Sequence, residues 1–246
     1  MKKITTILAS FMFFVAINVF SQNVGINTNC SSFSKIPTND LLAYYPFNNN
    51  ANDESGNGYN GNIDGAILTT DRFGNVNSAF SFDGDNDRIV LPFNSKIFTS
   101  NTFSLNFWYY KIKNTLGADS QGLIGSDNSV NRGINLNISN DFVRNHMYTG
   151  SIQQYYFDYY GAITNATWYF VTVQYNGSSF QMFVNGSLVH EIPASGNLYH
   201  NGINFEVGHD TYNTQSCRWF GGKIDDIRVY NRALTDLEIQ SLYREK

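Results

Sequence analysis

Two adjacent aspartates, Asp225 and Asp226, stand inside an apolar, β-branched stretch near the end of the sequence. Successive residues of a strand point to opposite faces, so one of the two carboxylates must lie on the face that Ile227 and Val229 occupy. Asp225 is the preferred candidate, because simple alternation puts it on that face. A carboxylate buried there needs a charge partner, strong hydrogen bonds or a cation, since burying it alone is very costly.

Aromatic side chains beside polar loops form a second group that could bind a ligand. Trp219 follows the polar stretch at 209–213, and four tyrosines gather between residues 155 and 160. Sugars stack their apolar faces on such rings, while nearby amides and carboxylates bond the hydroxyl groups. Alternation along a strand would expose about half of these tyrosines, and the other interpretation is a strand buried on both faces. The candidate ligand-binding residues are Trp219, Tyr155, Tyr156, Tyr159, His209 and Asp210.

Catalytic arrangements are not evident. Glycosidases need two carboxyl groups about 5–9.5 Å apart, but the glutamates, at 54, 191, 206, 238 and 245, are not paired closely along any strand. The four histidines lack zinc-ligand spacing, and no Gly-x-Ser-x-Gly elbow is present. The sequence therefore favours a binding protein over an enzyme.

The composition excludes several other classes. Of 246 residues, 42% are hydrophobic and 16% aromatic, which argues against a disordered chain or a coiled coil. The formal net charge is -4 and there is no basic block, so neither nucleic acid nor an anionic membrane surface is an expected partner.

The N-terminus has the pattern of a secretion signal over residues 1–21. Lys2 and Lys3 precede the apolar stretch Ile7–Phe20, and cleavage is expected just before Gln22. The mature protein should then be secreted or displayed at the cell surface, without membrane insertion. In an oxidising compartment Cys30 and Cys217 could form a disulfide, and the alternative is two free thiols.

Beyond a polar linker or arm at 22–40, the pattern over 41–246 is one of short strands separated by turn residues. Asn-Gly pairs at 176–177 and 185–186 are strong hairpin signals. The stretch at 235–243 is helical in pattern, with Thr235 as N-cap and Glu238 completing a capping box. The spacing predicts an all-β, two-sheet antiparallel sandwich with a short C-terminal helix.

Five parts of this domain carry recognisable motifs: Leu42–Phe47 with Ala51–Gly61, Ala79–Asp87, Phe103–Trp108, Trp168–Val171 with Phe180–Gly186, and Gly222–Leu234. In content and order they resemble the bacterial laminin G-like domains of the concanavalin A-like lectin/glucanase superfamily. The resemblance covers roughly residues 41–243 and implies a jelly-roll sandwich that binds glycans or other extracellular ligands. Because many functions share one fold, it does not identify the ligand.

The resemblance also implies a structural calcium ion, held by an Asp of the early glycine-rich loop and an acidic residue of the closing strand. The matching residues are Asp53 and the pair Asp225 and Asp226, with Asn57 as a further oxygen ligand. Calcium takes six to eight oxygens, and the loop glycines let carbonyls turn inward. The alternative is that Asp53 caps a turn, while the aspartate pair bonds backbone amides or meets Arg228.

These observations predict a secreted, carbohydrate-binding module stabilised by calcium. The alternative is an extracellular adhesion or protein-interaction domain without glycan specificity, and a glycosidase-like enzyme has less support. The expected partner is a glycan or an extracellular, cell-surface protein.

Overall fold

The computed structural model describes residues 35–92, 101–112, 120–126, 133–139, 142–150, 153–161, 163–199, 202–210 and 218–246. The predicted signal peptide, residues 22–34 of the predicted arm, and both cysteines lie outside these residues. The disulfide between Cys30 and Cys217 therefore stays a prediction.

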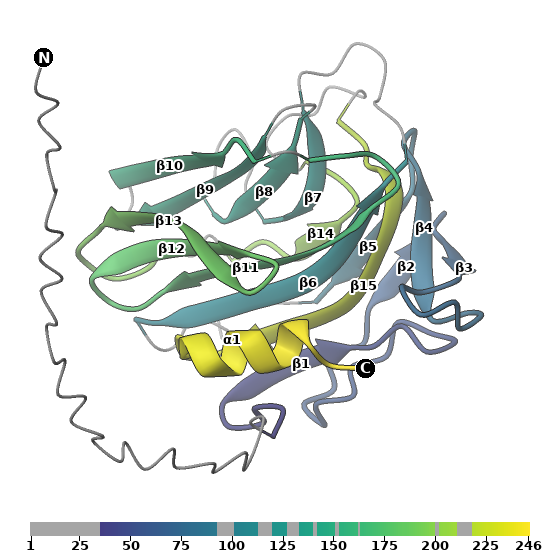
Figure 1. Ribbon diagram of the computed structural model, residues 1–246, viewed down its shortest axis with the longest axis horizontal. Helices are drawn as coiled ribbons and strands as arrows, with labels where there is room; N and C mark the ends of the chain where they lie inside the picture. The colour runs from purple at the N-terminus through teal and green to yellow at the C-terminus, as the bar shows by residue number, and fades with distance from the viewer. Residues whose placement is uncertain are drawn as a thin grey trace, which may run out of the picture. The chain divides into compact units, whose positions relative to one another are not determined.

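Two antiparallel sheets face each other across one core (Figure 1). In the described part of the chain, one sheet has eight strands in the order β13-β12-β11-β6-β15-β4-β3, with β1 also paired to β15; the other has seven in the order β10-β9-β8-β7-β14-β5-β2. The predicted all-β, two-sheet jelly-roll sandwich is confirmed. The eight-stranded sheet contains β1 (Leu41–Tyr45), β3 (Ile67–Thr69), β4 (Ala79–Asp83), β6 (Phe103–Lys111), β11 (Trp168–Tyr175), β12 (Ser179–Val184), β13 (Ser187–Pro193) and β15 (Gly221–Tyr230). The seven-stranded sheet contains β2 (Asn62–Asp64), β5 (Arg88–Leu91), β7 (Gln121–Gly125), β8 (Asn135–Ile138), β9 (Val143–Thr149), β10 (Gln153–Tyr159) and β14 (Phe205–Val207).

Alternating side chains of both sheets form the core between them. Phe107 and Tyr109 of β6 point inward from one sheet, and Leu136 and Ile138 of β8 from the other. Asn137, which lies between Leu136 and Ile138 in β8, then projects from the opposite face of its sheet. Each sheet consequently has an outer face whose side chains are free to take on other roles.

The central strand β15 contains a β-bulge at the aspartate pair. Asp225 lies opposite Trp108 and Arg228 opposite Asn106, so three steps along β15 match two along β6. Asp226, inside the bulge, has φ 50°, a left-handed conformation that Asp adopts more readily than most side chains. The extra residue breaks the alternation of the strand.

The bulge overturns one expectation. Ile227 and Val229 pack in the core, but Asp225 is opposite Trp108, which packs in a second apolar cluster on the outer face of the same sheet. The prediction that Asp225 shares a face with Ile227 and Val229 was wrong, because it assumed an unbroken strand. The buried carboxylate of Asp225 therefore lies outside the core that the two sheets enclose.

The helix α1 (Asp236–Tyr243) covers part of this outer face (Figure 1). Its predicted capping box is present, since Thr235 accepts from the Glu238 backbone N–H and the Glu238 carboxylate accepts from the Thr235 backbone N–H. The Tyr243 ring stacks on Trp108 with centroids 5.7 Å apart. Among the described residues, no helix has the length and apolar character of a membrane span.

Candidate functional site

Asp53 organises the glycine-rich loop after β1. Its Oδ1 accepts backbone N–H bonds from Tyr44 at 3.0 Å and Ser55 at 2.9 Å, and its Oδ2 accepts one from Tyr59 at 3.0 Å. Asn57 donates its side-chain amide to two backbone carbonyls of β1, at 3.1 and 3.0 Å. Both residues therefore bind the loop to the first strand. For Asp53 these contacts match the alternative to calcium binding, in which its carboxylate caps a turn.

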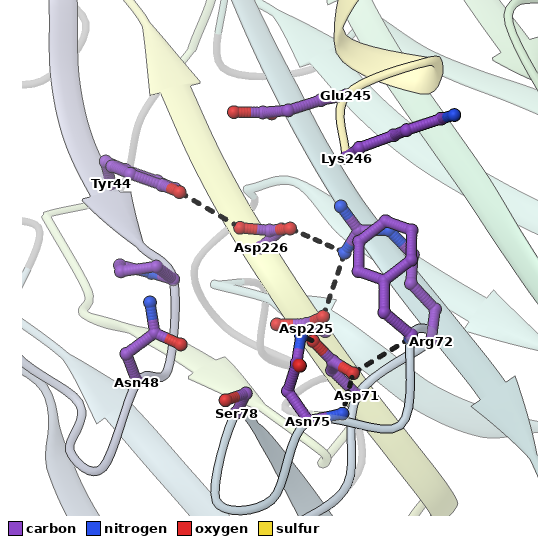
Figure 2. A pocket seen from close by; sticks show the side chains of 12 residues that line it. Tyr44, Asn48, Asp71, Arg72, Asn75, Ser78, Asp225, Asp226, Glu245 and Lys246 are labelled. Atoms are coloured by element: carbon purple, nitrogen blue, oxygen red, sulfur yellow. Dashed lines mark hydrogen bonds and ion pairs between the residues drawn. The ribbon is translucent and has the colours of Figure 1, made fainter.

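The aspartate pair on β15 has an arginine as its charge partner. Arg72, from the loop between β3 and β4, places Nη1 2.9 Å from Asp225 Oδ2 and 2.5 Å from Asp226 Oδ2 (Figure 2). The Tyr44 hydroxyl donates to Asp226 Oδ1 at 3.1 Å. The Arg72 guanidinium also lies 4.7 Å above the Trp108 ring, so it is buried between the two carboxylates and an aromatic face.

Tyr44, Arg72, Asp225 and Asp226 line a polar pocket of about 170 Å³. Asp225 Oδ1 is buried there without a hydrogen-bond partner. Burial, together with the neighbouring Asp226 charge, raises the pKa of Asp225 to about 8, although Arg72 acts in the opposite direction. The other pocket-lining residues include Asn48, Asp71, Phe73, Asn75, Ser78, Glu245 and Lys246.

The raised pKa of Asp225 gives a testable dependence of stability on pH. Because the folded-state pKa lies above the unfolded value of about 3.9, the stabilisation is complete below that value and is lost as pH rises through 8. Asp225→Asn keeps an oxygen acceptor for Arg72 and is expected to raise the free energy of unfolding at pH 9, by on the order of 1 kcal/mol or more. Urea unfolding between pH 5 and 9 measures this. A variant whose loss of stability with pH equals that of wild type would contradict the assignment; Asp236→Asn, on the exposed helix start, is the control.

The described residues do not fit the expected calcium site. Asp53 is engaged with backbone amides, whereas Asp225 and Asp226 hold a guanidinium where a cation would neutralise them. Tyr44 contacts both groups, but through its backbone N–H at one end and its hydroxyl at the other. No group of three or more acidic, histidine or cysteine side chains in the described residues could hold a metal ion. Calcium binding stays a prediction.

A second set of polar residues lies on the outer face of the seven-stranded sheet, which we call the polar face. One row crosses five of its strands, because each member pairs with the next in register. Asn135 Oδ1 and both ring nitrogens of His146 are buried without a hydrogen-bond partner. Buried polar groups are nearly always satisfied, so these atoms need partners, which a ligand would supply once a covering side chain moves aside. The row consists of Glu206, Gly125, Asn135, His146 and Tyr156.

The end of the row at β10 and β9 is aromatic. Tyr156 is 54% exposed, and its ring meets the His146 ring edge-on, with centroids 4.4 Å apart. Burial, with a further contribution from nearby Arg144, lowers the pKa of His146 to about 4. The imidazole is therefore neutral at pH 7, with one ring nitrogen as donor and the other as acceptor.

The other end of the row meets the segment 208–210 and Trp219. The His209 ring stacks on Trp219, with centroids 3.9 Å apart, and its Nδ1 lies 2.8 Å from Glu206 Oε2. Asp210 Oδ1 accepts from the Asn135 amide at 2.6 Å. The backbone of 209–210 passes directly over Gly122, where an added Cβ would lie 2.0 Å from the Asp210 nitrogen, so only glycine fits.

The structure thus brings together four of the six predicted ligand-binding residues: Trp219, His209, Asp210 and Tyr156 lie on or against the polar face. Tyr155 and Tyr159 point the other way and pack against the core, so they are not part of this surface. Three further residues of this face, Asn135, Glu206 and His146, were not among the ligand-binding residues predicted from the sequence. Asn135 could have been found from the sequence, because Asn135 and Asn137 alternate with Leu136 and Ile138. Arg72 gave no local signal, since its partners are more than 150 residues away.

The fold is a two-sheet jelly-roll sandwich whose seven-stranded sheet has a polar outer face. The family described as the concanavalin A-like lectin/glucanases superfamily matches residues 83–240, more than half of the chain. The chain belongs to this superfamily, as the sequence motifs predicted. The sequence has no significant match among curated proteins.

Solved structures show the same fold at low sequence identity. Domain 4 of AbnA, an extracellular GH43 arabinanase from Geobacillus stearothermophilus solved with arabinotriose, is 21% identical with a TM-score of 0.67; the match covers 83% of this chain and 98% of that one. The botulinum neurotoxin DC binding domain solved with SialylT is 16% identical, with a TM-score of 0.68 and coverage of 84% and 51%. The same toxin domain solved with rat synaptotagmin II is 17% identical, with a TM-score of 0.65 and coverage of 85% and 52%. The match thus spans about half of the toxin chains.

Proposed function

We propose that this protein is a secreted, non-catalytic module that binds a glycan on the polar face of its seven-stranded sheet. The observation that carries the proposal is the cross-strand row, in which unpartnered buried amide and imidazole atoms lie beside the exposed Tyr156 ring. A sugar offers hydroxyl groups for the polar atoms and an apolar face for the ring. Structural neighbours that were solved with arabinotriose and SialylT support a glycan as the ligand class.

The middle strand of the row carries no side chain of its own, because Gly125 occupies that position. Gly125 pairs with Asn135 on one side and Glu206 on the other. A Cβ on Gly125 would lie 2.8 Å from Asn135 Oδ1, so a larger residue would push against that amide. The Asn135 amide therefore covers the Gly125 backbone, and the exposed part of the row lies at its Tyr156 end.

The carboxylates of this face are engaged in ion pairs, which argues against glycosidase chemistry. Burial raises the pKa of Glu206, but hydrogen bonds and charges from His209 and Arg88 outweigh it and hold the pKa below its ordinary value. A glycosidase acid needs the opposite shift, since it must be protonated at the working pH. Asp210 is bound to Asn135 and to Arg218. Binding without hydrolysis is the activity that this arrangement supports.

Replacing Tyr156 with Ala should weaken glycan binding about tenfold, which corresponds to roughly 1.4 kcal/mol, because the stacking ring is lost. A glycan array identifies the ligand and titration calorimetry measures its Kd. Phe73→Ala is the matched control, since it removes another exposed aromatic ring, on the loop between β3 and β4. If Tyr156→Ala binds as wild type does, or if only a protein partner is captured and no glycan binds, the proposal fails.

A further inference from the structure

We infer that the glycan bound on the polar face is uncharged, an inference that rests on the proposed function. The arginines of this face in the described residues all contact carboxylates already. Arg144 bonds Asp158 through two nitrogens, each at 2.7 Å, and Arg218 bonds Asp210 at 2.8 Å. Arg88 lies 3.1 Å from Asp64 and 3.3 Å from Glu206.

The bidentate pair of Arg144 and Asp158 matters most, because it lies next to the aromatic end of the row. Arg144 is two residues from His146 along β9, and Asp158 is two residues from Tyr156 along β10, with the two strands in register. Bidentate arginine–carboxylate pairs are among the stronger hydrogen-bonded contacts of proteins. A sialic acid, uronic acid or sulfate that reached Arg144 would have to displace Asp158 or share the cation with it.

The balance of carboxylates and arginines among the described residues of this face is unfavourable to an anionic ligand. The same ion pairs contain four carboxylates, of Asp64, Asp158, Glu206 and Asp210, against three arginines. His146 adds no cation, because its pKa is lowered to about 4 by burial and by Arg144. Among the described residues of this face, the anionic part of an acidic glycan would therefore meet more carboxylates than arginines and carry an uncompensated desolvation cost.

Hydroxyl groups match the atoms that have no partner. Asn135 Oδ1 and Asn137 Oδ1 can only accept hydrogen bonds, whereas neutral His146 offers one donor and one acceptor. A neutral sugar supplies O–H groups that donate and oxygen atoms that accept, without any change in the ion pairs around them. The described residues of this face therefore select for hydroxyl-rich, uncharged saccharides.

The test is a glycan array that carries each neutral oligosaccharide beside its sialylated or uronic-acid counterpart, followed by calorimetry on the matched pair that binds best. Wild type should prefer the neutral member at least tenfold. Asp158→Asn frees the Arg144 guanidinium and should narrow this preference by fivefold or more. Glu191→Gln is the control, because it removes one negative charge from β13 in the other sheet, where Ser179 and Gln181 bond that carboxylate and no arginine pairs with it in the described residues.

Equal or tighter binding of the acidic member by wild type would overturn the inference while leaving the proposed function standing. So would an unchanged preference in Asp158→Asn, since the ion pair would not then set the selectivity. An equal effect of Glu191→Gln would also overturn it, because net charge rather than the pair would be responsible. Failure to bind any glycan would instead overturn the proposed function.

Discussion

Replacing Arg72 with Met should destabilise the fold by about 3–5 kcal/mol at pH 9, above the pKa of Asp225, because it leaves the buried carboxylates of β15 without a counter-ion. The Arg72 side chain is 7% exposed and the Asp225 side chain 3%, so water cannot replace the lost contacts. The methionine keeps an apolar stem against Trp108, which separates the loss of charge from the loss of packing. Urea unfolding monitored by tryptophan fluorescence measures the difference.

The pH dependence and a rescue variant distinguish an electrostatic cause from simple misfolding. Protonation of Asp225, whose pKa is raised to about 8, relieves part of the unpaired charge, so Arg72→Met should lose less stability at pH 5 than at pH 9. Adding Asp225→Asn and Asp226→Asn to Arg72→Met should recover much of the loss. Arg88→Met is the matched control, because Arg88 also contacts two carboxylates but is 35% exposed, and exposed pairs contribute about 0–1 kcal/mol. A similar loss in both arginine variants would contradict the role given to burial.

Asp53→Ala should cost about 3 kcal/mol, because three backbone N–H groups lose their acceptor and each costs about 1–3 kcal/mol when left unsatisfied. The melting temperature of a domain of this size should fall by roughly 6–12 °C. Asp53→Asn keeps the oxygen that accepts from Tyr44 and Ser55, so it should lose less. Differential scanning calorimetry of the three proteins measures the series.

The same variants decide the calcium prediction when a chelator is added. If Asp53 only holds the loop, its loss should destabilise the protein equally with and without chelator. If it is a calcium ligand, chelator should lower the melting temperature of wild type and leave Asp53→Ala unchanged. That second outcome would contradict the assignment of Asp53 as a loop anchor and restore the metal site expected from the family. Asp85→Ala, in another Asp-rich turn, is the control.

Buried acidic side chains of this fold are therefore stabilised in two different ways. Asp53 is stabilised by dipoles of its own loop, through contacts that span nine residues or fewer. The pair on β15 is stabilised by a guanidinium from a distant loop, which closes over the outer face of the eight-stranded sheet (Figure 2). The first kind of contact forms locally, whereas the second requires the sheet to be assembled.

Local patterns in the sequence were enough for the architecture. The spacing of short strands between turn residues predicted the two-sheet sandwich, although β2, β3 and β9 were not predicted. Asn-Gly pairs predicted the hairpins, and Thr235 with Glu238 predicted the start of α1, because each depends on a few neighbouring residues. The motifs also predicted the superfamily. The turn-capping alternative for Asp53 could be stated for the same reason, since Asp side chains bond the backbone a few residues on.

Only the tertiary structure decided which residues meet. Arg72 reaches Asp225 and Asp226 because β4 lies beside β15 in the sheet, a pairing that no short window of sequence contains. The bulge at Asp226 turned Asp225 away from Ile227, because one extra residue reverses the alternation on which the prediction relied. The polar face likewise exists only when β7, β8, β9, β10 and β14 are in register. The sequence alone thus predicted that one aspartate of the pair is buried and needs a partner. The register of the assembled sheet determined that this partner is an arginine.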